Sequence, residues 1–259
     1  MKQTISAVLT VKNEEGIIEN CLDKLTWVDE IIIIDNNSTD NTVKICKKYT
    51  NKIYTISETL LIPELQQKGI EKATKKWVII LDADVIVPNQ AAEEIQQQIN
   101  LGIYDGFYLI HQNYFLGKPL RGHFKSHNIL KLFKRGKGHF PGNAAHESII
   151  FLGTQVGIIK TPLIHNSHPN INTFIRKANL YSSQDAVNLV DKEVVGILHK
   201  KVRKLTFYKL FIEPILYFFH FLLIRKAIIT GYRGFILSGL FSMYLFMERI
   251  KMYELKICS

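Results

Sequence analysis

The sequence predicts an α/β fold with a Rossmann-like, mostly parallel sheet flanked by helices, followed by a C-terminal helical extension. Three observations support this. In the first half of the chain, short apolar runs alternate with segments of helical periodicity, as βαβ units do. Residues 31–34 and 78–81 are continuously apolar, which is typical of strands covered on both faces. Residues 210–247 have a helical pattern rich in large apolar side chains.

The expected elements follow one another in a regular order. Strands are expected at residues 5–10, 30–34, 53–56 and 77–81, and helices at residues 14–25, 40–49, 65–75 and 90–101. Local signals agree, because residues 36–40 are turn and capping types and Gly102 follows the last of these helices. Two more strands are expected at residues 106–111 and 156–164, in a middle region rich in glycine, histidine and aromatic residues.

The composition is globular and basic. Of 259 residues, 47% are hydrophobic and 22% charged, and the formal net charge is +10. An anionic partner is therefore expected, either nucleic acid, an acidic membrane surface or a phosphorylated small substrate. Nucleic acid is disfavoured because the basic residues neighbour apolar helices and no recognition motif occurs. Three widely spaced cysteines and an N-terminus without a secretory pattern predict a reducing, cytoplasmic location.

The C-terminal third combines basic residues with two apolar runs. The run at residues 210–224 contains Glu213 and is shorter than the roughly 20 apolar residues of a membrane span. The run at residues 227–247 contains Arg233. Helices lying on an anionic membrane surface are expected, which would make the protein peripheral on the inner face of the cytoplasmic membrane. A two-helix membrane hairpin and plain burial against the rest of the chain are the alternatives.

A carboxylate pair follows the apolar run at residues 78–81. Asp82-Ala83-Asp84 stands at the end of an expected strand, and Asp35 ends another. Ligands of open α/β sheets bind outside the carboxyl ends of the strands, so Asp35 and Asp82 are expected to face one site. Two carboxylates together with a diphosphate would bind Mg²⁺ or Mn²⁺. Asp84 is the expected metal ligand, with Asp82 serving metal or nucleotide; a solvated turn is the alternative.

Further polar residues are candidates for the same site. Glu147 lies in a loop bounded by glycine and proline and is the expected base for a hydroxyl proton, or else a surface residue. His165 is a candidate third metal ligand or diphosphate contact, although a lone histidine in such a place is more often structural. The nucleotide-side candidates are Thr10, Asn13, Glu14, Ser38 and Ala83, and the acceptor-side candidates are His111, Asn113, Arg121 and His146.

With these residues in place, the chain resembles the inverting family 2 glycosyltransferases with a GT-A fold, in particular a branch for lipopolysaccharide core assembly. The matching stretches are residues 6–15, 27–31, 35–42, 81–84, 113–117, 132–136, 146–147 and 231–235. The resemblance implies transfer of a sugar from a nucleotide-diphosphate sugar to a saccharide acceptor with inversion, in lipopolysaccharide core or other cell-envelope glycan assembly. A lipid-linked, phosphorylated acceptor would suit both the basic residues and the apolar C-terminus.

The resemblance also implies roles and boundaries. Positions equivalent to Thr10, Glu14 and Asp35 contact the nucleoside in that family, the Asp-x-Asp motif carries metal and diphosphate, and a downstream acid, here Glu147, is the base. The chain would divide into a nucleotide-sugar-binding half (1–115), an acceptor and catalytic loop region of the same domain (116–180) and a C-terminal basic and hydrophobic extension (181–259).

Two departures from the branch pattern stand out. Val85 replaces a frequent Glu after the motif, and Gln66-Gln67 replaces a basic-Asn pair, which makes Lys68 a candidate cation for the donor. Two other functions remain open on the sequence alone. One is a catalytically inactive, membrane-associated protein that binds nucleotide sugars. The other is a magnesium-dependent phosphatase, which is disfavoured because its aspartate motif usually follows the first strand.

Overall fold

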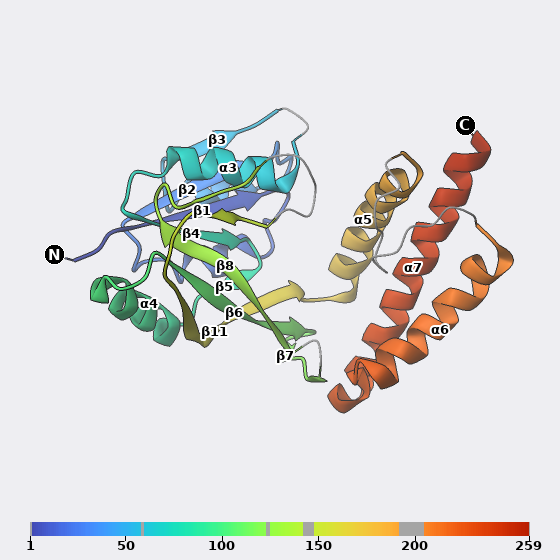
Figure 1. Ribbon diagram of the computed structural model, residues 1–259. Coiled ribbons are helices and arrows are strands. Elements are labelled where there is room, and N and C mark those ends of the chain that lie inside the picture. Colours follow the sequence, from blue (N-terminus) through green and yellow to red (C-terminus); the bar gives the residue numbers. More distant parts are fainter. Residues whose placement is uncertain (1, 58–59, 123–124, 142–147, 192–204, 259) are drawn as a thin grey trace. The chain divides into compact units, whose positions relative to one another are not determined.

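The computed structural model describes residues 2–57, 60–122, 125–141, 148–191 and 205–258 (Figure 1). The chain divides into two compact units. An α/β unit comprises Met1–Gln112 and His127–Asn166, and a helical unit comprises Asn113–Ser126 and Ser167–Ser259.

A mixed sheet forms the centre of the α/β unit. In spatial order its strands are β3 (Ile53–Thr55), β2 (Glu30–Asp35), β1 (Ile5–Val11), β4 (Trp77–Asp82), β8 (Ser126–Lys134), β6 (Gly106–Phe115), β11 (Val156–His168) and β5 (Val85–Ile86). The first four are parallel to one another, and we call them the first half of the sheet. The second half, from β8 to β5, joins it through the antiparallel pair of β4 and β8. The predicted α/β class is confirmed.

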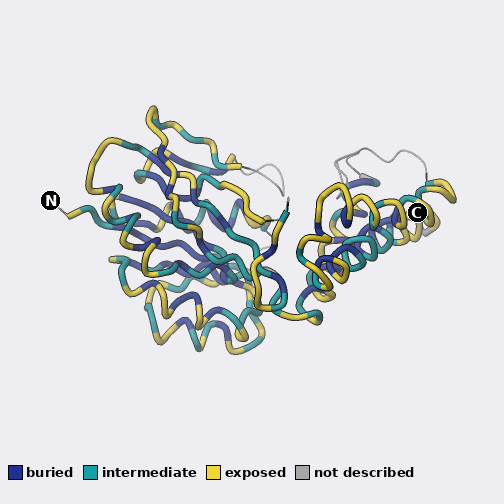
Figure 2. Tube along the Cα trace, turned by 90° about the horizontal axis from the view of Figure 1, so that it is seen from below, coloured by how far each residue is buried: buried dark blue, intermediate teal, exposed yellow. Residues whose placement is uncertain are grey.

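Helices cover both faces of the first half. The helices are α1 (Ile18–Leu22), α2 (Thr42–Cys46), α3 (Ile62–Lys72) and α4 (Asn89–Leu101). One apolar cluster joins alternate residues of β1 and β4 to α1, α2 and α4, and a second joins the intervening residues to α3. Gly69 lets α3 approach closely, because a Cβ there would lie 2.3 Å from Val8 Cγ1. Burial on both faces, visible as dark strands in Figure 2, explains the continuous apolar runs.

The strands of the first half begin and end within about a residue of the predicted positions, but two helices differ. The helices expected at residues 14–25 and 40–49 have only five residues each, α1 and α2. Turns at residues 15–17 and 23–24 flank α1, and turns at residues 47–49 follow α2. The segments before the two helices are also bonded to each other's neighbourhood. The Glu14 N–H donates to Thr42 Oγ1 at 2.8 Å, and the Asn41 N–H donates to Glu15 Oε2 at 2.9 Å. These bonds tie the segment before α1 to the start of α2.

Three helical segments pack together in the helical unit. They are α5 (Ile171–Asp191), a bent segment of η2 (Tyr208–Ile212), α6 (Glu213–Phe219) and η3 (His220–Ile224), and α7 (Tyr232–Cys258), which follows the short turn η4 (Ala227–Thr230). Their core includes Phe174, Phe221 and Leu237. Gly234 is required at the start of α7, because a Cβ there would overlap the carbonyl oxygen of Ala227 at 1.8 Å.

Glu213, the charged residue inside the first apolar C-terminal run, is paired with Arg249 of α7. Arg249 and Glu248 are both buried and form an ion pair, and Arg249 Nη2 lies 3.2 Å from Glu213 Oε2. Pairing of this kind lets charged residues occur in a helix that is otherwise apolar. Among the described residues, no helix combines the length and the apolar character that crossing a membrane requires.

Candidate active site

The carboxyl ends of three parallel strands lie at one edge of the sheet. In the registers of β1 with its two neighbours, Thr10 aligns with Asp82 of β4, and Val11 aligns with Asp35 of β2. The two aspartates therefore end their strands at nearly the same level, as the sequence predicted. The Thr10 hydroxyl is buried at this edge and has no hydrogen-bond partner within the described part of the chain.

The loops after β1 and β2 are bonded into one polar unit. The Asn13 N–H donates to Ser38 Oγ at 3.0 Å, and the Thr39 N–H donates to Asn13 Oδ1 at 2.8 Å. Asp35 is buried, and its Oδ1 accepts the Ser38 N–H at 3.1 Å. Asn13 has φ 53°, a left-handed conformation that asparagine tolerates better than most residues. The structure thus brings together the predicted nucleotide-side residues Asn13, Asp35 and Ser38.

Asp82 is held by two partners that the sequence analysis did not assign. Lys131 Nζ of β8 lies 2.6 Å from Asp82 Oδ2, and Gln66 Nε2 of α3 donates to Asp82 Oδ1 at 3.3 Å. Burial opposes ionisation of Asp82, but the charge and hydrogen bond of Lys131 outweigh it, so the pKa of Asp82 is lowered. The available signal was Lys131 itself, a lysine between two leucines in an apolar strand. A buried ammonium here needs an anionic partner.

Asp84 lies beside His165, as expected for two ligands of one cation. His165 Nε2 is 3.5 Å from Asp84 Oδ1, and the Asn166 N–H donates to the Asp84 carbonyl oxygen at 2.9 Å. A shallow pocket adjoins them, lined by Ile17, Asn20, Ala83, Asp84, Ile86 and Asn166. The buried Asn166 Oδ1 has no hydrogen-bond partner among the residues that the structure describes. A carboxylate, an imidazole and an amide oxygen are all donors that suit a divalent cation.

The departure at Val85 has a structural explanation. Val85 is fully buried in β5 and pairs with His165 of β11. A glutamate at this position would bury a charge among apolar side chains, which is unfavourable without a partner. The short strand instead fixes the backbone next to Asp84.

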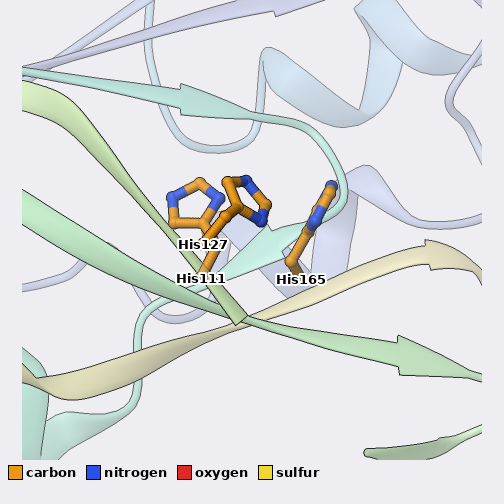
Figure 3. A group of neighbouring side chains, drawn as sticks. All are labelled: His111, His127 and His165. Atoms are coloured by element: carbon orange, nitrogen blue, oxygen red, sulfur yellow. The ribbon is translucent and has the colours of Figure 1, made fainter. Parts of the chain in front are cut away.

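Two more histidines accompany His165 in the second half of the sheet. His111 of β6 and His127 of β8 contribute rings next to it, and one nitrogen from each of the three lies within 4.8 Å of the others (Figure 3). Burial and the nearby charge of Lys131 lower the pKa of His111 to about 3. His111 was predicted for the acceptor side, whereas His127 was not predicted, because it is distant in sequence and carries no motif.

The remaining predicted residues fall elsewhere. Lys68 lies half-buried on α3. Asn113 and Arg121 belong to the helical unit, where Arg121 lines a pocket with Lys118, Pro119, Ile229, Thr230, Gly231 and Arg233. His146 and Glu147 lie outside the described residues.

Comparisons with known proteins agree with this architecture. The model of glycosyl transferase family 2 matches residues 6–161. A glycosyltransferase of Rickettsia felis is 26% identical over 97% of this chain and 90% of its own length. The lipopolysaccharide core biosynthesis glycosyltransferase LpsC of Rhizobium meliloti is 26% identical over 98% of this chain and 93% of its own length. Residues 1–349 of S. aureus TarS, in complex with UDP-GlcNAc, align with a TM-score of 0.52 at 12% identity, covering 99% of this chain and 92% of that one. That likeness is one of fold and confirms the GT-A architecture.

Proposed function

The chain belongs to glycosyl transferase family 2 and is a glycosyltransferase. We propose that it moves a sugar from a nucleoside-diphosphate sugar to a saccharide acceptor with inversion at the anomeric carbon. The arrangement around Asp82 carries the proposal. It ends β4 at the same edge as Asp35, and Lys131 and Gln66 hold both of its carboxylate oxygens. A fixed carboxylate at this position is suited to orient neutral hydroxyl groups of a bound nucleotide.

The nucleoside would bind at the loops after β1 and β2. Asp35 and Ser38 present fixed polar groups there, and the buried Thr10 hydroxyl offers a further hydrogen bond. Asn13 and Glu14 complete this part of the proposed site. Their backbone N–H groups donate to Ser38 and Thr42, which fixes the loop after β1 next to the segment after β2. Lys68 on α3 is proposed as a donor-side cation. The chain would thus use residues 1–115 for the donor, 116–180 for the acceptor and catalysis, and 181–259 as the C-terminal extension.

Asp84 and His165 would hold Mg²⁺ or Mn²⁺, with Asp82 as the additional carboxylate. Their donor atoms fit such an ion, since a carboxylate oxygen and an imidazole nitrogen lie 3.5 Å apart. When bound, the ion neutralises negative charge on the diphosphate that leaves. Lys131 adds a second positive charge beside Asp82.

Glu147 is proposed as the base. It would take the proton from an acceptor hydroxyl, whose oxygen bonds to the anomeric carbon as the bond from that carbon to the diphosphate breaks. His111, Asn113, Arg121 and His146 are proposed on the acceptor side. The Glu147→Gln variant should bind donor normally but lose transfer, and an unchanged turnover number would remove Glu147 from this role.

The acceptor is proposed to be lipid-linked and phosphorylated, at the inner face of the cytoplasmic membrane. Lys118, Arg121 and Arg233 line one pocket of the helical unit, and the buried Arg233 Nη1 has no hydrogen-bond partner among the described residues. Large apolar side chains are exposed close to it in sequence, including Ile228, Ile229 and Tyr232. Cations beside apolar groups suit an anionic membrane surface.

Vesicle binding tests the membrane part of the proposal. Replacing Arg121 by Gln should weaken binding to anionic vesicles about fivefold, because a cation near such a surface contributes about 1 kcal/mol. The matched variant Lys160→Gln, in the α/β unit, should bind as the wild type does. Equal effects of the two substitutions, or no effect of either, would place the contact elsewhere.

A transfer assay tests the reaction itself. UDP-sugars are the first donors to try, because the TarS fragment binds UDP-GlcNAc and shares this fold. Lipopolysaccharide core saccharides are the first acceptors, because LpsC has a role in that assembly and aligns over nearly the whole chain. The expected product carries the transferred sugar with the opposite anomeric configuration, which NMR determines. Retention of configuration would contradict the inverting mechanism.

A further inference from the structure

Three histidines from three adjacent strands meet beside the carboxylates. His127, His111 and His165 lie on β8, β6 and β11, which are consecutive in the sheet order. Their ring centroids are 5.2, 5.5 and 5.8 Å apart, and Figure 3 shows the rings gathered as one group. No ring stacks flat on another, so each can direct a nitrogen toward a common point.

The distances are close to those of a metal centre. The selected nitrogen atoms lie within 4.8 Å of one another. With metal–nitrogen bonds of about 2.05 Å, two ligands of a tetrahedral zinc ion are about 3.4 Å apart. Side-chain rotations of the exposed His127 and half-buried His165 can supply the difference, since neither is enclosed by core packing.

A second observation points to a ligand at the same place. Nε2 of His111 is buried and has no hydrogen-bond partner within the described ranges, although the residue is only 1% exposed. Buried polar atoms nearly always have a partner, so an orphaned nitrogen in a histidine cluster indicates water or an ion.

We propose that His111, His127 and His165 form, in the nucleotide-free protein, a binding site for a zinc-like divalent transition-metal ion, which shares His165 with the proposed Mg²⁺ or Mn²⁺ site but not its carboxylate ligands. Three imidazoles with an open fourth position are a familiar zinc donor set, whereas Mg²⁺ prefers oxygen ligands. The surrounding charge suits a cation, because Asp82 and Asp84 outnumber the single ammonium of Lys131. The ion would cross-link the three strands β8, β6 and β11.

Cobalt binding tests the proposal without any nucleotide, so the result does not depend on the proposed transfer reaction. Co²⁺ replaces Zn²⁺ readily and has visible ligand-field bands in a tetrahedral nitrogen site. Wild-type protein should bind one equivalent with such bands, and Zn²⁺ should abolish them. The His127→Ala variant should lose at least about tenfold in affinity, while the exposed His220→Ala variant, in the helical unit, should match the wild type.

Two further measurements make the result decisive. Zn²⁺ should raise the Tm of the wild type and of His220→Ala but not of His127→Ala, whose unchanged Tm without metal would show that it folds. The Asp84→Asn variant should keep the cobalt bands, because the imidazoles hold the ion. Loss of the bands in Asp84→Asn, equal cobalt binding in His127→Ala, or no cobalt binding by the wild type would each overturn the proposal.

Discussion

The first half of the sheet supplies carboxylates to the candidate site, whereas the second half supplies nitrogen groups. Asp35 and Asp82 end parallel strands of the first half, while Lys131, His111 and His127 lie within strands of the second. The ion pair between Asp82 and Lys131 joins the two sets directly at 2.6 Å. The anionic groups are thus positioned by the ends of the parallel strands. The neighbouring strands place cations and candidate metal ligands next to them.

The largest effect is expected at the carboxylate side. Asp84→Asn should lower the transfer rate roughly 100-fold to 1000-fold, because the ion that offsets charge on the leaving diphosphate loses its principal ligand. The fold should persist, since asparagine has nearly the same shape. Steady-state kinetics with circular dichroism measures both. Asp23→Asn, at an exposed aspartate bonded to Tyr49, is the control and should retain full activity. Near-normal turnover in Asp84→Asn would contradict the metal assignment.

Removing the cation on the other side should have the next effect. Lys131→Met leaves the Asp82 carboxylate without its ion pair. A hydrogen bond to a charged group contributes about 2 kcal/mol. If donor binding loses that free energy, donor affinity should fall roughly 30-fold. Calorimetry of nucleotide binding measures the change. Lys134→Met is the matched control, because Lys134 is on the same strand but pairs with Asp105. If both variants bound donor equally well, the ion pair between Lys131 and Asp82 would not contribute to donor binding.

A third prediction concerns the opposite end of a first-half strand. Glu30 begins β2, is buried, and accepts hydrogen bonds from Ser6, Thr74 and Lys52. Burial works against its ionisation, but these bonds lower its pKa to about 2. Glu30→Gln should cost about 2 kcal/mol of unfolding free energy at pH 7 while leaving kcat unchanged.

The pH dependence follows from the sign of that shift. The ordinary pKa of glutamate is about 4.3, so the stabilisation by Glu30 is complete above that pH and is lost as the pH falls toward 2. Urea unfolding of the wild type and Glu30→Gln at several pH values measures this. The two curves should converge in acid; a constant difference would show that the carboxylate charge is not the cause.

The smallest effect is expected at Gln66. Its amide Nε2 donates a hydrogen bond to Asp82 Oδ1 at 3.3 Å, which is long, and the donor carries no charge. Gln66→Leu should therefore weaken donor binding only about threefold, with Asp82 still held by Lys131. A loss as large as that of Lys131→Met would mean that the amide, rather than the ion pair, positions Asp82.

The same contrast between the halves governs what the sequence could predict. The parallel strands, Asp35 and the Asp82–Asp84 motif were predictable, because strand ends follow apolar runs and the carboxyl ends of parallel strands meet. Lys131 and His127 were not assigned roles, because their partners are far away in sequence. The pairing of β4 with β8 brings Lys131 to Asp82, and the order of β8, β6 and β11 brings His127 to the other two histidines. The shortness of helices α1 and α2 also escaped prediction, because part of each expected helical segment forms turns instead.

Nucleotide binding most directly tests whether the carboxyl ends of β1, β2 and β4 bind a nucleoside-diphosphate sugar. UDP, GDP and ADP would each be added to wild-type protein with Mn²⁺, and the Tm compared with that of Asp84→Asn. At least one nucleotide should raise the wild-type Tm in a Mn²⁺-dependent way, and Asp84→Asn should lose this response. An identical increase in both proteins, or none in the wild type, would contradict this prediction.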